Sequence, residues 1–145
     1  MSNVWFIGDI HGGHKNVHKF RKQFQSEEDH YQHVKTNFHK VVKKRDKVFF
    51  MGDTAFTLER LQDISTWVCG RKVLICGNHD TDHIPMKVLC EYFDEVYSLY
   101  KWHEFWLSHC PIHPDELRGK VNIHAHCHYA TINDKRYFNT SLENT

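Results

Sequence analysis

The sequence lacks an excess of charge of either sign. Its 19 Lys and Arg residues nearly balance 18 Asp and Glu residues, which leaves a net charge of +1 with neutral histidine. A dedicated nucleic-acid-binding domain would show a strong basic excess or a basic stripe. We therefore expect no stable nucleic-acid binding, although a small nucleotide or a short RNA end stays open as a substrate.

Long apolar runs are also missing. No segment approaches the roughly 20 apolar residues that a membrane-spanning helix needs. The start of the chain leads straight into a strand-like segment, so no signal peptide is expected. The five cysteines are odd in number and show no disulfide-like spacing. These absences predict a cytoplasmic protein with reduced thiols and no membrane partner. They leave the oligomeric state open.

Linkers, repeats and low-complexity segments are absent too, so residues 1–145 are expected to form a single domain. Apolar runs predict buried strands, and stretches of helical periodicity lie between them in the first half. We predict strands at Val4–Ile7, 48–51 and 73–76, helices at about 14–24, 28–43, 58–68 and Met86–Tyr92, then strands at 95–100 and 104–108 (as a hairpin), 121–124, 136–140 and a closing strand at 139–143. The β-α-β-α-β order implies parallel strands with helical crossovers, in an α/β fold of two packed sheets flanked by helices.

Histidine is what the sequence has in abundance, with 14 among 145 residues. Polar side chains follow five apolar strands, in the segments Gly8-Asp9-Ile10-His11, Gly52-Asp53, Gly77-Asn78-His79-Asp80, Ser108-His109 and His124-Ala125-His126-Cys127-His128. Sites in open α/β sheets form outside the carboxyl ends of the strands, so these side chains are expected at one edge. Concentrated carboxylates and imidazoles destabilise one another unless a cation holds them together.

The types of side chain indicate which cation. A mixture of imidazole, carboxylate and amide oxygen suits Mn, Fe, Zn or Ni better than Ca. The candidate metal ligands are Asp9, His11, Asp53, Asn78, His109, His126 and His128. This set exceeds the need of one ion and suits two ions that share a carboxylate. Two ions about 3.5–4 Å apart are the recurrent arrangement for hydrolysis of phosphate esters.

The ordered motifs from Asp9 to His128 resemble the calcineurin-like metallophosphoesterase superfamily, and in particular its small stand-alone members from bacteria and phages. Gly12-Gly13-His14 continues the first motif in the manner of these small enzymes. The Asp-Arg-Gly that follows the second motif in protein Ser/Thr phosphatases is missing after Asp53. One departure is Ala125, where the family usually has glycine.

The resemblance implies a fold and a role for each residue. The fold would be a four-layer α-β-β-α sandwich of two mixed sheets flanked by helices. Asp9, His11 and His128 would hold the first ion, Asp53 would bridge the two ions, and Asn78, His109 and His126 would hold the second. His79 would face the scissile phosphate as a catalytic residue, and Asp80 would orient it from behind.

The remaining histidines and cysteines divide into two groups. His14 could contact the substrate phosphate as a further catalytic residue or be a supporting group, and His113 and His124 pose the same alternative. We interpret His18, His30, His33 and His39 as surface residues, and Cys110 and Cys127 as small apolar fillers that point away from the site.

The function expected from these observations is hydrolysis of a phosphodiester by metal-bound hydroxide, with two divalent transition-metal ions, Mn²⁺ first among them. The substrate would be a small phosphate ester such as a cyclic nucleotide, a small nucleotide or an RNA end. A phosphomonoesterase or a nucleotide pyrophosphohydrolase is the alternative among enzymes. An alternative of another class is a non-catalytic metal-binding scaffold for protein interactions.

Overall fold

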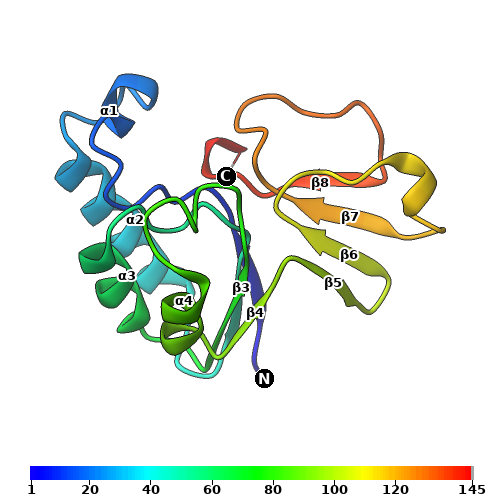
Figure 1. Ribbon diagram of the computed structural model, residues 1–145, viewed down its shortest axis with the longest axis horizontal. Coiled ribbons are helices and arrows are strands. Elements are labelled where there is room, and N and C mark those ends of the chain that lie inside the picture. The colour runs from blue at the N-terminus through cyan, green and yellow to red at the C-terminus, as the bar shows by residue number, and fades with distance from the viewer. Residues whose placement is uncertain (145) are drawn as a thin grey trace.

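The computed structural model describes residues 1–144 as two stacked sheets, with α-helices on the outer side of the first (Figure 1). The first sheet has the order β1-β2-β3-β4, and its strands are all parallel because each connection is a helical crossover. Its strands are β1 (Val4–Ile7), β2 (Lys47–Phe50), β3 (Arg71–Ile75) and β4 (Glu95–Tyr97), and the helices between them are α1 (Val17–Phe20), α2 (Glu27–Val41), α3 (Leu58–Ser65) and α4 (Met86–Tyr92). The predicted β-α-β-α-β order is confirmed.

The second sheet contains β5 (Leu99–Trp102), β6 (Phe105–Ser108), β7 (Val121–His124) and β8 (Tyr137–Asn139), in that order. β5 and β6 are antiparallel, whereas β6, β7 and β8 run parallel, so only this second sheet is mixed. The single strand predicted at 95–100 is wrong. The chain leaves the first sheet after Tyr97 and enters the second at Leu99, and the hairpin forms between β5 and β6.

Alternating side chains of the central strands build two cores. On β2, Val48 and Phe50 face the helices, while Phe49 and the following Met51 face the second sheet. Such alternation follows from the period of two residues along a strand. Because both faces are covered, β2 and β3 are apolar throughout their buried parts, as parallel strands in α/β proteins are. The packing on both faces holds these strands in place, and the site lies beyond their carboxyl ends.

The outer face of the second sheet is covered by residues 110–118, which include the short 3₁₀ helix η1 (Pro114–Glu116). Trp106 Nε1 donates to the carbonyl of Leu117 at 3.1 Å, and the Tyr137 hydroxyl donates to the carbonyl of Ile112 at 2.7 Å. The predicted sandwich of two sheets is therefore confirmed, with this short segment as its fourth layer. In residues 1–144 no helix is long and apolar enough to cross a membrane.

Two elements near the site differ from the prediction. The helix predicted at 14–24 is limited to the single turn α1, because the chain turns at Arg21 and buries its guanidinium. The closing strand predicted at 139–143 is a single bridge between Gly8 and Ser141, followed by the 3₁₀ helix η2 (Leu142–Asn144). The turn at Arg21 and the short helix η2 bring Arg21 and Glu143 into contact, next to the backbone of Asp9 and Ile10 that follows β1.

Candidate metal centre

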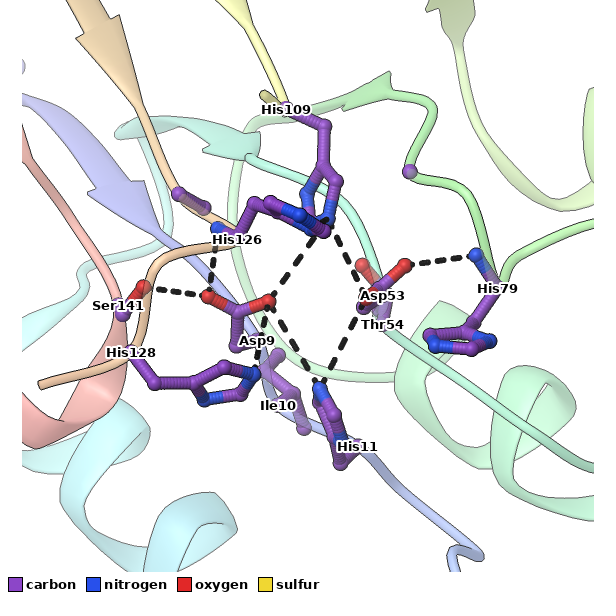
Figure 2. A network of polar contacts seen from close by, with 12 residues as sticks. Asp9, Ile10, His11, Asp53, Thr54, His79, His109, His126, His128 and Ser141 are labelled. Atoms are coloured by element: carbon purple, nitrogen blue, oxygen red, sulfur yellow. Dashed lines mark hydrogen bonds and ion pairs between the residues drawn. The ribbon is translucent and has the colours of Figure 1, made fainter. Parts of the chain in front are cut away.

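Side chains that follow β1, β2, β6 and β7 meet at one edge of the two sheets (Figure 2). Three overlapping groups of side chains each have their nitrogen, oxygen or sulfur atoms within 4.8 Å of one another, and these groups are Asp9, His11 and His128; Asp9, Asp53 and His109; and His109, Cys110 and His126. The fold therefore brings together side chains that lie as many as 119 positions apart in the chain, as Asp9 and His128 do.

The Asp9 carboxylate lies at the centre of this group. Its Oδ2 accepts hydrogen bonds from the backbone N–H of His126, at 2.9 Å, and from the Ser141 hydroxyl. Its Oδ1 is buried and has no hydrogen-bond partner within residues 1–144. Instead it faces the Nε2 atoms of His11 at 3.7 Å, His109 at 3.9 Å and His128 at 4.0 Å. An oxygen surrounded by imidazole nitrogens beyond hydrogen-bonding range is the arrangement that a cation would complete.

The Asp53 carboxylate extends the centre toward β3. Asp53 Oδ2 lies 3.2 Å from His109 Nε2 and 3.8 Å from His11 Nε2, while Oδ1 accepts the backbone N–H of His79 at 2.9 Å. Burial by itself would raise the pKa of Asp53, but the contact with His109 outweighs it and holds the pKa below its usual value. Burial would also raise the pKa of Asp9, but its contacts with His11 and Ser141 outweigh burial and lower the pKa to about 2. Both carboxylates are thus charged at neutral pH and available to a cation.

Two of the histidines are held by acceptors outside the centre. His109 Nδ1 donates to the carbonyl of Met51 at 2.8 Å, and His128 Nδ1 lies 2.7 Å from a carboxylate oxygen of Glu143. A proton on Nδ1 leaves the lone pair on Nε2, and in both rings Nε2 is the atom that faces Asp9. Metal-ligating histidines show this outer hydrogen bond almost always. The donor set therefore fits a transition-metal ion.

The second half of the predicted ligand set is partly assembled. His126 Nδ1 lies 3.3 Å from His109 Nε2, and the two rings are 5.1 Å apart. Asn78 is exposed in the loop that carries His79, beside Asp53. Cys110 was expected to point away as a filler, and this is wrong: it is exposed, and its sulfur belongs to one of the three groups. A thiolate there would favour Zn²⁺ or Fe over Mn²⁺.

Several residues that follow the strand ends have a strained, left-handed backbone conformation. The residues with positive φ other than glycine include five predicted ligands, namely Asp9 (55°), His11 (56°), Asp53 (52°), His126 (70°) and His128 (52°). Such a conformation costs of order 1 kcal/mol or more per residue and persists where function requires it. Ala125 is not among these residues, so alanine in place of the usual glycine brings no backbone strain. Its methyl group instead packs in the core against Gly8, where a second Cβ would clash.

His79 lies at the border of the centre, with Asp82 rather than Asp80 beside its ring. His79 Nδ1 is 2.7 Å from an Asp82 carboxylate oxygen. The role predicted for Asp80 is wrong, because its carboxylate accepts hydrogen bonds from the backbone N–H groups of Gly77 at 2.6 Å, Thr54 at 2.8 Å and Asp53 at 2.9 Å. Burial raises the pKa of Asp80 to about 6 against the effect of these donors. Asp80 therefore fixes the loop that presents Asp53, and Asp82 orients His79.

The aromatic ring of Phe56 was missed by the sequence argument. Its centroid lies 5.0 Å from that of His11, 5.1 Å from His14 and 5.5 Å from His79. His14 is half-buried, and burial lowers its pKa, so the ring is neutral near neutral pH. Phe56 thus packs against three histidines, two of which, His11 and His14, also contact each other. Nothing in the local sequence indicates this, because the contacts join three different strand ends.

Arg21 and Glu143 form a buried ion pair directly behind the centre. The Arg21 guanidinium lies 3.1 Å from Glu143 and donates to the carbonyls of Asp9 at 2.6 Å and Ile10 at 3.3 Å. His30, predicted as a surface residue, is instead buried at 2.8 Å from the same guanidinium. Burial would raise the pKa of Glu143, but His128 and Arg21 lower it to about 2. Sequence reasoning missed this pair because it spans 122 positions.

Replacing Glu143 with glutamine should weaken metal binding about 10- to 100-fold, because an uncharged amide holds His128 less firmly and leaves Arg21 without its counter-ion. Titration calorimetry of metal-stripped protein with Mn²⁺ measures the change. Glu116→Gln is the matched control, since Glu116 lies on the surface beside Arg118. Unchanged Mn²⁺ affinity in a folded Glu143→Gln protein, as judged by circular dichroism, would show that Glu143 does not support the metal ligands.

The chain is similar to known proteins in sequence and in fold. The family model for calcineurin-like phosphoesterases matches residues 2–144. The Gene 66 protein of Mycobacterium phage L5 is 31% identical over 91% of this chain and 80% of its own length. The uncharacterized protein MJ1445 of Methanocaldococcus jannaschii is 30% identical over 99% of this chain and 83% of its own. Among solved structures, the protein of unknown function AQ665 from Aquifex aeolicus superimposes with a TM-score of 0.75 at 25% identity, over 97% of this chain and 90% of that one.

Proposed function

The chain belongs to the calcineurin-like phosphoesterase family, whose members are metal-dependent hydrolases, and from this premise we propose that it hydrolyses phosphodiesters with two divalent transition-metal ions. The substrates we propose are small nucleotide esters, such as a cyclic nucleotide or the end of an RNA. Mn²⁺ is the proposed ion, and the exposed Cys110 makes Zn²⁺ and Fe the ions to compare with it.

The observation that carries the diester proposal is a pocket of about 520 Å³ that opens directly on His11 and His128. A phosphomonoester has one organic substituent, which is the leaving group. A diester has a second substituent, which must find room beside the reacting phosphorus. The pocket offers this room next to side chains of the metal centre, and its volume lies within the usual range for small-molecule sites.

Bound ions would polarise the phosphate oxygens and make a water molecule acidic enough to react near neutral pH. The protein's own groups complete the site. The ring of His79 is about half exposed, and Asp82 fixes its Nδ1 as a hydrogen-bond donor. Its Nε2 is then the atom that can give a proton to the departing oxygen, and the Asp82 carboxylate stabilises the imidazolium that holds this proton. Neutral His14 and the Phe56 ring line the approach between His79 and His11.

The test is hydrolysis of bis(p-nitrophenyl) phosphate and p-nitrophenyl phosphate, side by side, by metal-stripped protein with and without Mn²⁺, Zn²⁺ or Fe²⁺. We expect metal-dependent turnover with a clear preference for the diester. A preference for the monoester would support the phosphatase alternative and overturn the diester proposal. Absence of turnover with every ion, in protein that binds those ions, would support the interaction scaffold instead.

A further inference from the structure

The pocket of about 520 Å³ beside the metal centre has two unusual aromatic residues in its wall. Phe20, at the end of α1, is 70% exposed, and Tyr129, directly after His128, is 66% exposed. Phe138, at the edge of the second sheet, is the remaining aromatic residue of comparable exposure in residues 1–144. Large apolar side chains that gather in the open beside a site usually mark a binding surface.

The charge of the same pocket is positive. Lys19 and Lys22 contribute to its lining, and both are exposed. Glu143 also lines it, but its carboxylate is occupied by Arg21 and His128. The lysines therefore have no competing free carboxylate among the lining residues, and the pocket favours an anionic ligand with a flat apolar part.

The position of the two rings relative to the metal centre limits what that ligand can be. The Phe20 ring lies 5.9 Å from the His14 ring, which is in turn 5.7 Å from His11, a side chain of the centre. Tyr129 is joined to His128 by one peptide bond, so it cannot lie far from the centre either. Both rings line the same pocket as His11 and His128, so one ligand can place its phosphate at these histidines and its flat part against the aromatic side chains.

We propose that this pocket is a nucleoside subsite, in which Phe20 and Tyr129 stack on the base of a nucleotide ester whose phosphate lies at the metal centre. The proposal rests on the proposed function. It identifies the substituent of the diester that stays bonded to the phosphorus when the leaving group departs. Aromatic side chains bind bases of different kinds through their π-faces, so the subsite selects nucleosides over alkyl groups and discriminates little among bases. Lys19 and Lys22 add attraction for the charged phosphate and its neighbours.

The test compares two diesters that share the leaving group p-nitrophenolate and differ in the other substituent. Thymidine 5′-(p-nitrophenyl phosphate) carries a nucleoside, and methyl p-nitrophenyl phosphate carries a methyl group. We expect kcat/KM with Mn²⁺ to be about 5- to 100-fold higher for the thymidine ester, which is the usual range for stacking on one base. In Phe20→Ala and in Tyr129→Ala this ratio falls toward 1. In Phe138→Ala, the control with an equally exposed aromatic residue, the ratio stays as in the unaltered protein.

Three results can be told apart. Equal kcat/KM for both esters, or a ratio that survives both substitutions, overturns the subsite and leaves phosphodiester hydrolysis standing. Failure to hydrolyse either ester overturns the proposed activity. In that case calorimetry of thymidine 5′-monophosphate binding to metal-loaded protein tests the subsite alone. Weaker binding to Phe20→Ala and Tyr129→Ala than to the unaltered protein supports the subsite. Absence of binding to the unaltered protein, or equal binding to the variants, overturns the subsite.

Discussion

Replacing Asp53 with asparagine is expected to abolish metal binding and hydrolysis together. Asp53 is 2% exposed, and its Oδ2 is the oxygen that faces both His109 and His11. Asparagine has nearly the same shape but carries no charge, and its amide group can turn two N–H donors toward imidazoles that need a cation between them. In the proposed two-ion centre this carboxylate would be shared by both ions, so we expect at least about a 100-fold loss of Mn²⁺ affinity and at least about a 1,000-fold loss of kcat/KM.

Two measurements and one control make this prediction decisive. Calorimetry gives the affinity and the number of ions bound, and hydrolysis of bis(p-nitrophenyl) phosphate gives the rate. Asp115→Asn removes a carboxylate that is 88% exposed, away from the centre, and should alter neither quantity. If Asp53→Asn bound two ions with unchanged affinity, Asp53 would not be their shared ligand, and the assignment of the whole centre would need revision.

The strand ends could be predicted from the sequence because their cause is local. An apolar run between helical stretches predicts a buried parallel strand, and parallel strands bring their carboxyl ends to one edge. Asp9 and Asp53 meet at that edge as a direct consequence, whereas His109 follows β6 of the second sheet and reaches them because the two sheets stack. The positive φ values of Asp9 and Asp53 then turn the side chains inward, which asparagine, aspartate and histidine tolerate better than most residues.

The supporting contacts could not be predicted, because each one joins segments that are distant in sequence. Helical periodicity around Phe20 extends the predicted helix to residue 24, but the buried ion pair of Arg21 with Glu143 outweighs local propensity and ends α1 early. The role predicted for Asp80 is wrong for a similar reason. The adjacency of Asp80 to His79 in the sequence predicts that the two side chains interact, whereas three backbone N–H groups from two strand ends satisfy the Asp80 carboxylate.

Replacing His79 with alanine should leave the metal affinity unchanged and lower the rate of hydrolysis about 100- to 10,000-fold. The His79 side chain belongs to none of the three groups of potential ligands. Its contact with the centre is the backbone N–H that donates to Asp53 Oδ1, and alanine keeps that group (Figure 2). What alanine removes is the imidazole that, in the proposed mechanism, gives a proton to the leaving oxygen.

The neighbouring residues supply the comparison for this variant. His83→Ala removes another exposed histidine of the same loop and should leave turnover unchanged. Asp82→Asn should cause a smaller loss than His79→Ala, because the ring stays but its Nδ1 partner is neutral. Since a good leaving group needs little protonation, the His79→Ala defect should shrink with p-nitrophenolate and grow with an alcohol such as the ribose oxygen of a nucleotide. If the variant lost metal and activity in equal measure, His79 would be a metal ligand; if it lost neither, His14 would be the remaining histidine placed to serve the leaving group.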